Sequence, residues 1–212
     1  MISTMKKPMK KKPQTDPQKS SPEANSQLPT PISTPDFTEE TALAFFARYL
    51  DGLKWKFRCI EDRPILFCGF NGEQVQWDFN MTVREMSPGL FQLGVNSFLP
   101  NKVLPPRRPA AMELLTRINF ELAIGCFEMN LAEGEIRCRT SVLIPAADIT
   151  QGIVEHLVRS NIYIVEERYP QIMAVLYSGT SPEDSIKISA SDQHPASSIQ
   201  QPPGSEPRFD FN

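Results

Sequence analysis

The sequence predicts an α+β domain in which an antiparallel sheet is covered on one face by helices. The apolar patterns follow the order α-β-β-β-β-α-β-β-α, and runs of strands separated by helices are typical of this class. A strand with one apolar and one polar face also needs a cover on its apolar side. One stretch shows that alternation clearly, because every second residue is apolar: Val75, Trp77, Phe79, Met81 and Val83.

The folded domain is expected between two tails that are poor in large apolar residues. Seven prolines precede Phe37 and five follow Thr180, among many Ser, Gln, Lys and Asn residues. Such segments bury too little apolar surface to offset the entropy of ordering. We therefore expect disorder in residues 1–36, which are rich in Lys and Pro, and in residues 181–212, which are acidic. Residues 37–180 are enough for one domain with its own core.

The first element is predicted to be a helix within residues 37–53, FTEETALAFFARYLDGL. Thr38 is placed to cap its N-terminus, and two glutamates follow, where carboxylates favour the positive helix end. Gly52 is a suitable stop. The apolar residues of its buried face lie three or four apart: Leu43, Phe46, Tyr49 and Leu50.

Four strands are expected next, beginning with the alternating segment 55–59 and the apolar segment 65–70. Asn71-Gly72 is a strong signal for a two-residue hairpin turn, which would place Leu66 opposite Trp77. This pairing puts apolar residues of both strands on one face.

A three-residue loop at 87–89, Ser-Pro-Gly, is predicted between the third and fourth strands, because it pairs Val83 with Leu93. The proline-rich connector NKVLPPRRP then leads to a second helix within residues 110–123. Its apolar residues recur at helical spacing: Ala111, Leu114, Leu115, Ile118 and Leu122.

The segment CFEMNLAEGEIRCRTSVLI predicts a second hairpin around Glu133-Gly134, with Phe127 opposite Thr140. This register puts Cys138 on the core face and Cys126 on the opposite face. The four cysteines show no CxxC spacing, so a zinc ribbon is not indicated. We expect them to be small buried hydrophobes, with a redox pair of the first two as the alternative: Cys59, Cys68, Cys126 and Cys138.

The last helix is predicted to begin at Asp148, which forms a capping box with Gln151. Its apolar stripe continues past Pro170, which indicates a kinked helix or two abutting helices. Asn161 lies within this stripe, and Asn119 lies close to the stripe of the second helix. We expect both to be structural, because buried amides must find hydrogen-bond partners.

No sequence pattern indicates an enzyme. The motifs GxSxG, GxxxxGK, GxGxxG and HExxH are absent. His156 is expected to be a surface or half-buried residue, and His194 lies in the predicted C-terminal tail. Glu166 and Glu167 are adjacent on a helix, so their carboxylates diverge. We expect no catalytic residue, no cofactor and no metal.

The candidate contacts with a partner protein are polar side chains of the alternating strand and the densest basic spot of the domain, which lies beside Lys102. Solvated surface is the favoured explanation for each of these side chains taken singly, with a phosphate or acidic-peptide contact as the alternative for the two arginines. The candidates are Gln76, Asp78, Asn80, Thr82, Arg107 and Arg108.

Charge and hydropathy favour a cytoplasmic protein. The formal net charge is −3, and the predicted domain is mildly acidic, which argues against nucleic-acid binding. No apolar run is long enough for a transmembrane helix, and no apolar segment follows the lysines of MISTMKKPMKKKPQ as a secretory signal requires. These lysines could instead contact an anionic surface, which is a further alternative.

The order of elements, with the segment MELLTRINFELAIGCFEMNLAEGEIRCRTSVLI and the closing helix RYPQIMAVL, resembles the YbjN family. The matching features are the 115–119 helix segment, Gly125, the Glu133-Gly134 hairpin, the capped helix at Asp148 and Tyr169-Pro170. The resemblance covers roughly Phe37 to Gly179. It implies a bacterial sensory transduction regulator with a fold similar to that of type III secretion chaperones.

The resemblance also implies a non-enzymatic module that acts through protein contacts, chaperone-like or regulatory, and a homodimer is compatible with it. We therefore expect the folded domain to bind a partner protein. The alternative is a small-ligand-binding protein or enzyme with a pocket between sheet and helices.

Overall fold

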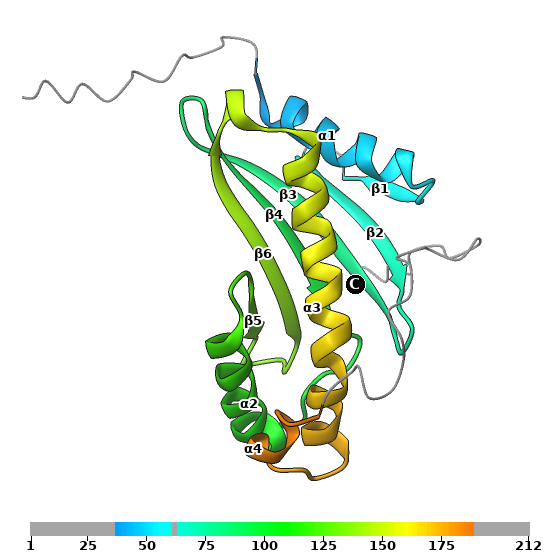
Figure 1. The fold of residues 1–212 in the computed structure, drawn as a ribbon, viewed down its shortest axis with the longest axis vertical. Helices are drawn as coiled ribbons and strands as arrows, with labels where there is room; N and C mark the ends of the chain where they lie inside the picture. The colour runs from blue at the N-terminus through cyan, green and yellow to red at the C-terminus, as the bar shows by residue number, and fades with distance from the viewer. Residues whose placement is uncertain (1–36, 61–62, 189–212) are drawn as a thin grey trace, which may run out of the picture. The chain divides into compact units, whose positions relative to one another are not determined.

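The protein, described here from a computed structural model, is defined over residues 37–60 and 63–188, and the fold is of the predicted α+β class (Figure 1). The helices are α1 (Glu39–Gly52), α2 (Arg108–Glu121), α3 (Gln151–Tyr177) and α4 (Pro182–Ser185), with 3-10 turns at Pro105–Arg107 and Ala146–Asp148. The strands are β1 (Phe57–Cys59), β2 (Ile65–Asn71), β3 (Gln76–Ser87), β4 (Leu90–Phe98), β5 (Cys126–Met129) and β6 (Ile136–Pro145).

The strands of the described chain form one antiparallel sheet in the order β1-β2-β3-β4-β6-β5. Helices α1 and α3 lie over the same face of this sheet (Figure 1), α1 against β2 and β3 and α3 against β4 and β6. The predicted cover of the apolar face is therefore confirmed.

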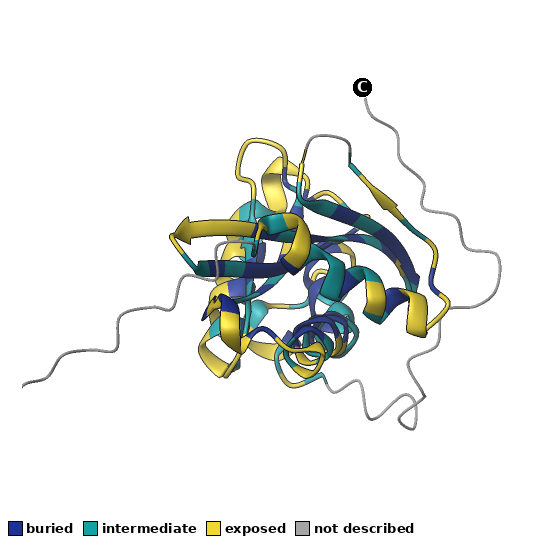
Figure 2. Ribbon diagram, turned by 90° about the horizontal axis from the view of Figure 1, so that it is seen from above, coloured by how far each residue is buried: buried dark blue, intermediate teal, exposed yellow. Residues whose placement is uncertain are grey.

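The alternation along β3 corresponds to burial, as the colour bands of the strands in Figure 2 show. Trp77, Phe79, Met81 and Val83 are each at most 4% exposed. Burying four such side chains contributes roughly 6–12 kcal/mol of transfer free energy, at about 1.5–3 kcal/mol each. Packing alone explains why every second residue of this strand is apolar.

The predicted two-residue turn at Asn71-Gly72 is wrong. Asn71 pairs with Gln76, so residues 72–75 form a four-residue loop, and Leu66 lies opposite Met81. Gly72 does not have the positive φ that a type I′ turn requires. It is a glycine because the chain packs closely: a Cβ there would lie 2.6 Å from a ring carbon of Trp77.

In the structure, each β2 residue pairs with a β3 residue four positions further along the chain than predicted, and four is an even number. The same side chains therefore stay on the same face, and the predicted core of this hairpin is correct although the pairing was not. The loop is fixed by α3, since the backbone N–H of Glu73 donates to the Glu166 carboxylate at 3.2 Å.

The register predicted for the β3–β4 hairpin is confirmed, because Val83 pairs with Leu93. Its loop differs in detail: Ser87 pairs with Leu90, and a bulge follows Glu85. The β5–β6 register is displaced by two residues, so that Phe127 lies opposite Cys138 rather than Thr140. This shift is also even, and it again leaves the two faces unchanged.

Helix termini follow local capping chemistry only in part. Thr38 caps α1 as predicted, accepting a hydrogen bond from the N–H of Thr41. The cap of α3 is Thr150 instead of Asp148, which lies in the preceding 3-10 turn. Helix α3 continues through Pro170 as one helix to Tyr177.

The described chain continues beyond Thr180, where we expected the C-terminal tail to begin. Ser185 of α4 is fully buried, and the side-chain amide of Gln171 donates to the carbonyls of Ile186 and Ile188. The predicted tails at 1–36 and from 189 onward lie outside the described residues. None of the helices described here is both long and apolar enough to cross a lipid bilayer.

Candidate functional site

The sheet face opposite α1 and α3 carries polar side chains, which we call the polar sheet face. All four strand residues predicted as partner contacts lie on it: Gln76 is exposed, and Asp78, Asn80 and Thr82 are partly buried. Apolar side chains of Phe67, Phe98 and Leu143 lie among the polar ones on this face. By strand pairing, its polar and thiol side chains are Arg58 of β1, Asn71 of β2, Gln76, Asp78, Asn80, Thr82 and Arg84 of β3, Gln92 and Asn96 of β4, Cys126 and Glu128 of β5, and Arg137, Arg139 and Ser141 of β6.

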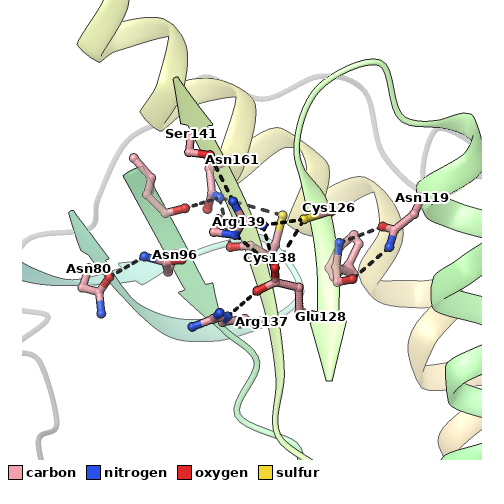
Figure 3. Close-up of polar contacts among 12 residues, drawn as sticks. Asn80, Asn96, Asn119, Cys126, Glu128, Arg137, Cys138, Arg139, Ser141 and Asn161 are labelled. Carbon is pink, nitrogen blue, oxygen red and sulfur yellow. Dashed lines mark hydrogen bonds and ion pairs between the residues drawn. The ribbon is translucent and has the colours of Figure 1, made fainter. Parts of the chain in front are cut away.

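The centre of the polar sheet face is a pair of asparagines. Asn80 and Asn96 are directly opposite each other on β3 and β4, and the Asn96 amide donates to Oδ1 of Asn80 at 2.9 Å (Figure 3). Asn96 is only 8% exposed, although it lies on the polar face. The pair is thus fixed by the sheet itself, with donors and acceptors at defined positions.

A carboxylate between two arginines forms the β5–β6 end of this face (Figure 3). Oε2 of Glu128 accepts from Nε of Arg137 at 2.6 Å. Oε1 accepts from Nε and Nη2 of Arg139 at 3.1 and 2.7 Å. The other terminal nitrogen of Arg139 donates to Ser141 at 3.1 Å. Arg139 is therefore held in one orientation by groups on both sides.

The electrostatics of this cluster favour the ionised carboxylate. Partial burial of Glu128 opposes ionisation, but hydrogen bonds and charges from Arg139 and Arg137 outweigh it and lower the pKa of Glu128. The hydrogen bond to Glu128 in turn raises the pKa of Arg139. At neutral pH the cluster holds two positive charges and one negative charge.

Asp78 is the second carboxylate of the polar sheet face, and its surroundings are different. Its strand neighbours are Gly69 on β2 and Phe98 on β4. Desolvation by burial raises the pKa of Asp78 above its ordinary value. Burial thus disfavours the ionised form of Asp78, whereas the two arginines favour the ionised form of Glu128.

The two predicted basic contacts lie away from this face, in the connector before α2. Arg107 is exposed, and its neighbour Arg108 is partly buried. The Arg108 guanidinium donates to the backbone carbonyls of Val103 at 3.2 Å and Leu131 at 2.8 Å. It therefore joins the connector to the β5–β6 loop, and only Arg107 keeps its guanidinium in solvent.

The cysteines are all free thiols, but they are not all buried. The prediction of a buried Cys59 is wrong, because β1 is a short strand of three residues and this side chain is exposed. Cys68 and Cys138 are buried as expected, and Cys126 is on the opposite face from Cys138. Burial raises the pKa of Cys68 to about 12 and also raises that of Cys126, so both thiols stay protonated at neutral pH.

The two asparagines singled out in the sequence are structural. The Asn119 side chain accepts from the N–H of Phe127 at 2.7 Å and donates to its carbonyl at 2.9 Å (Figure 3), so it occupies the outer edge of β5. Asn161 is fully buried and accepts from Ser97 at 2.5 Å, while its amide donates to the carbonyls of Val95 and Cys138 at 3.2 Å.

Sequence reasoning missed the residues that complete the polar sheet face. They come from three other strands, and only the neighbourhood of β4 and β6 in the sheet brings them beside β3. Polar and apolar residues alternate in CFEM and IRCRT, and this alternation marks which side chains share a polar face. Only the strand order shows that this face continues the polar face of β3. The missed residues are Asn96, Glu128, Arg137 and Arg139.

The remaining candidates for a catalytic or metal site are His156 and groups of His, Cys, Asp and Glu side chains. His156 is exposed on α3. Within residues 37–60 and 63–188, no three His, Cys, Asp or Glu side chains are grouped so that they could hold a metal ion.

Comparison with known proteins identifies the family. Residues 44–173 match the family YbjN, described as "Putative bacterial sensory transduction regulator". A solved structure, "Crystal structure of YbjN, a putative transcription regulator from E. coli", is similar with a TM-score of 0.42 and 14% sequence identity, over 65% of this chain and 90% of that chain. No curated protein matches the chain. Because the family match extends over more than half of the sequence, the chain belongs to the YbjN family.

Proposed function

We propose that the protein is a non-enzymatic interaction module, regulatory or chaperone-like, which binds a partner protein through the polar sheet face of its folded domain. The family description as a regulator agrees with this role. In the proposed division of the chain, the folded domain that begins at residue 37 holds the binding surface, and residues 1–36 are a tail. Helix α4, which lies beyond Thr180, packs on this domain.

The observation that carries the proposal is the fixed arrangement of polar groups on a sheet face that α1 and α3 leave uncovered. The amides of Asn80 and Asn96 hold each other in place, and Glu128 holds two guanidinium groups. Side chains that are already ordered lose little conformational entropy when a partner binds, which increases the affinity available from each contact. Polar side chains that only serve solubility need no such mutual fixation.

The charges on this face favour an acidic segment of the partner. On β3, β5 and β6, three arginines lie among two carboxylates, whereas the whole chain has a net charge of −3: Arg84, Arg137 and Arg139, with Asp78 and Glu128. The planar guanidinium group binds carboxylates in a bidentate manner. Among the described residues, Arg137 bonds to Glu128 through Nε alone, which leaves its two terminal nitrogens for a partner.

The test is affinity capture from native lysate with full-length baits, read by mass spectrometry. Arg137→Glu reverses one charge on the polar sheet face. Arg117→Glu on α2 is the matched control, because both arginine side chains are 44% exposed and both pair with a glutamate, at 2.6 and 2.7 Å. We expect one or two proteins to be captured by the wild type and the Arg117→Glu control and lost with Arg137→Glu.

Two outcomes would count against the proposal. Capture that is equal with all three baits would place the binding surface elsewhere. If no protein is enriched on the wild-type bait, the chain does not act through a stable protein contact under these conditions.

A further inference from the structure

A groove of about 420 Å³ lies between the end of α2 and the middle of α3, away from the polar sheet face. Leu122 and Ile124 line one side, where the chain leaves α2. The α3 side consists of Ile164 and Tyr163, with a charged residue at each end: Arg159 and Glu167. The groove is thus apolar in the middle and charged at both ends.

Large apolar side chains remain in solvent beside this groove. Of the residues that line the groove, Tyr163 is 61% exposed and Ile124 is 57% exposed. Single exposed apolar residues are common, but two large ones in the same groove indicate a surface that another chain covers. The remaining question is which partner fits the charges.

The charges along α3 are symmetric about Tyr163. Arg159 and Glu167 lie four residues before and four residues after it, and residues four apart lie on the same side of a helix. If α3 packs antiparallel against an identical helix with Tyr163 at the two-fold axis, Arg159 of each copy meets Glu167 of the other. A two-fold interface requires this reciprocal relation, in which residue i contacts j and j contacts i.

We propose that the groove between α2 and α3 is the interface with a second copy of this chain, with Tyr163 at the two-fold axis. Two symmetry-related ion pairs then set the register, and Tyr163 and Ile124 of each copy are removed from water against the other. An unrelated partner is not expected to carry charges complementary to both Arg159 and Glu167 at the two ends of the groove.

Neighbouring charges do not prevent these contacts. Arg159 bonds to Glu155 one turn earlier at 3.2 Å, but both side chains are largely in solvent, at 54% and 43% exposure. Glu167 lies 3.9 Å from Arg168, which bonds more closely to Glu121. The solvent-exposed Arg159–Glu155 pair is weak, and the contact of Glu167 with Arg168 is long, so Arg159 and Glu167 can turn toward a second copy.

The test measures the molar mass and dimer dissociation constant of the full chain by sedimentation. We expect the wild type to be a dimer. In an Arg159→Glu homodimer, the introduced carboxylate would face Glu167 at both contacts, and in a Glu167→Arg homodimer two arginines would face each other. Each single variant should weaken the dimer by about tenfold or more, because two attractive contacts become repulsive.

An equimolar mixture of the two single variants gives the sharpest result. In a heterodimer of Arg159→Glu with Glu167→Arg, one contact joins the two introduced charges and the other joins the two native ones. In the first contact the two charges have exchanged positions, and the second contact is the wild-type pair. Both contacts are attractive, so the mixture should restore the dimer. Arg117→Glu, on the outer side of α2, is the control and should leave the dimer unchanged.

The proposal is overturned if the wild type is monomeric, and the groove would then serve another occupant. It is also overturned if the single variants remain dimeric or if their mixture stays monomeric while each is folded by circular dichroism. The result is independent of the partner captured through the polar sheet face, because Arg137→Glu should leave the dimer intact.

Discussion

Replacing Asn161 with alanine should destabilise the protein by about 3 kcal/mol. The side chain is fully buried, and it joins α3 to β4 and β6 through the Ser97 hydroxyl and the carbonyls of Val95 and Cys138. The Ser97 hydroxyl accepts from the indole N–H of Trp77 at 2.9 Å. The network is therefore a continuous buried chain of donors and acceptors from β3 to α3.

The magnitude follows from what the substitution leaves behind. Two hydrogen bonds to carbonyls are lost, at ~0.5–1.5 kcal/mol each, and the buried Ser97 hydroxyl loses its acceptor, which costs ~1–3 kcal/mol. Alanine is the better helix former and returns roughly 0.6 kcal/mol. The sum is a large fraction of a typical stability of about 5–15 kcal/mol.

Urea denaturation of the full chain measures this free energy of unfolding. Asn80→Ala is the control, because it removes one hydrogen bond in a partly buried pair, and we expect it to cost about 1 kcal/mol or less. In a Ser97→Ala background the orphaned hydroxyl is absent, so the cost of Asn161→Ala should fall by at least about 1 kcal/mol. A cost below about 1 kcal/mol, or no coupling between the two sites, would refute the reasoning.

Two further substitutions test the edge and the polar face of the sheet. Asn119→Ala should lower the free energy of unfolding by about 1–2 kcal/mol, because the N–H and carbonyl of Phe127 at the β5 edge lose their partner. An unchanged midpoint of urea denaturation would contradict this role. Asp78→Asn should stabilise the protein at pH 7, because desolvation by burial raises the folded-state pKa of Asp78 and its ionisation therefore disfavours the folded state. The gain should be full above that folded-state pKa and vanish below the unfolded pKa, where both forms are neutral, so melting curves that differ equally at about pH 3 and pH 7 would argue against it.

The sequence by itself determined the class of the fold and most of the residues that form the core, with the exposed Cys59 as an exception. Period-two alternation along β3 required one buried face, and helical spacing of residues such as Phe46 and Ile118 required covers for it. This information is local, since each residue's face follows from its neighbours two, three or four positions away. It also survived two register errors, because both shifts were even.

Tertiary packing decided the turns and the caps. Asn71-Gly72 has the composition of a tight turn, yet the contact of Gly72 with Trp77 and the bond from Glu73 to Glu166 of α3 fix a longer loop. The bond to α3 joins residues far apart in the chain, so no local pattern contains it.

The candidate site depended on strand order. Asn80 was identified from alternation, whereas its partner Asn96 and the arginines around Glu128 belong to strands whose place beside β3 is a property of the whole sheet. Arg108 shows the opposite case, because a basic residue that looks available in the sequence is used to hold two backbone carbonyls. The sequence states which groups can make contacts, and the packing of distant segments decides which of them are already satisfied.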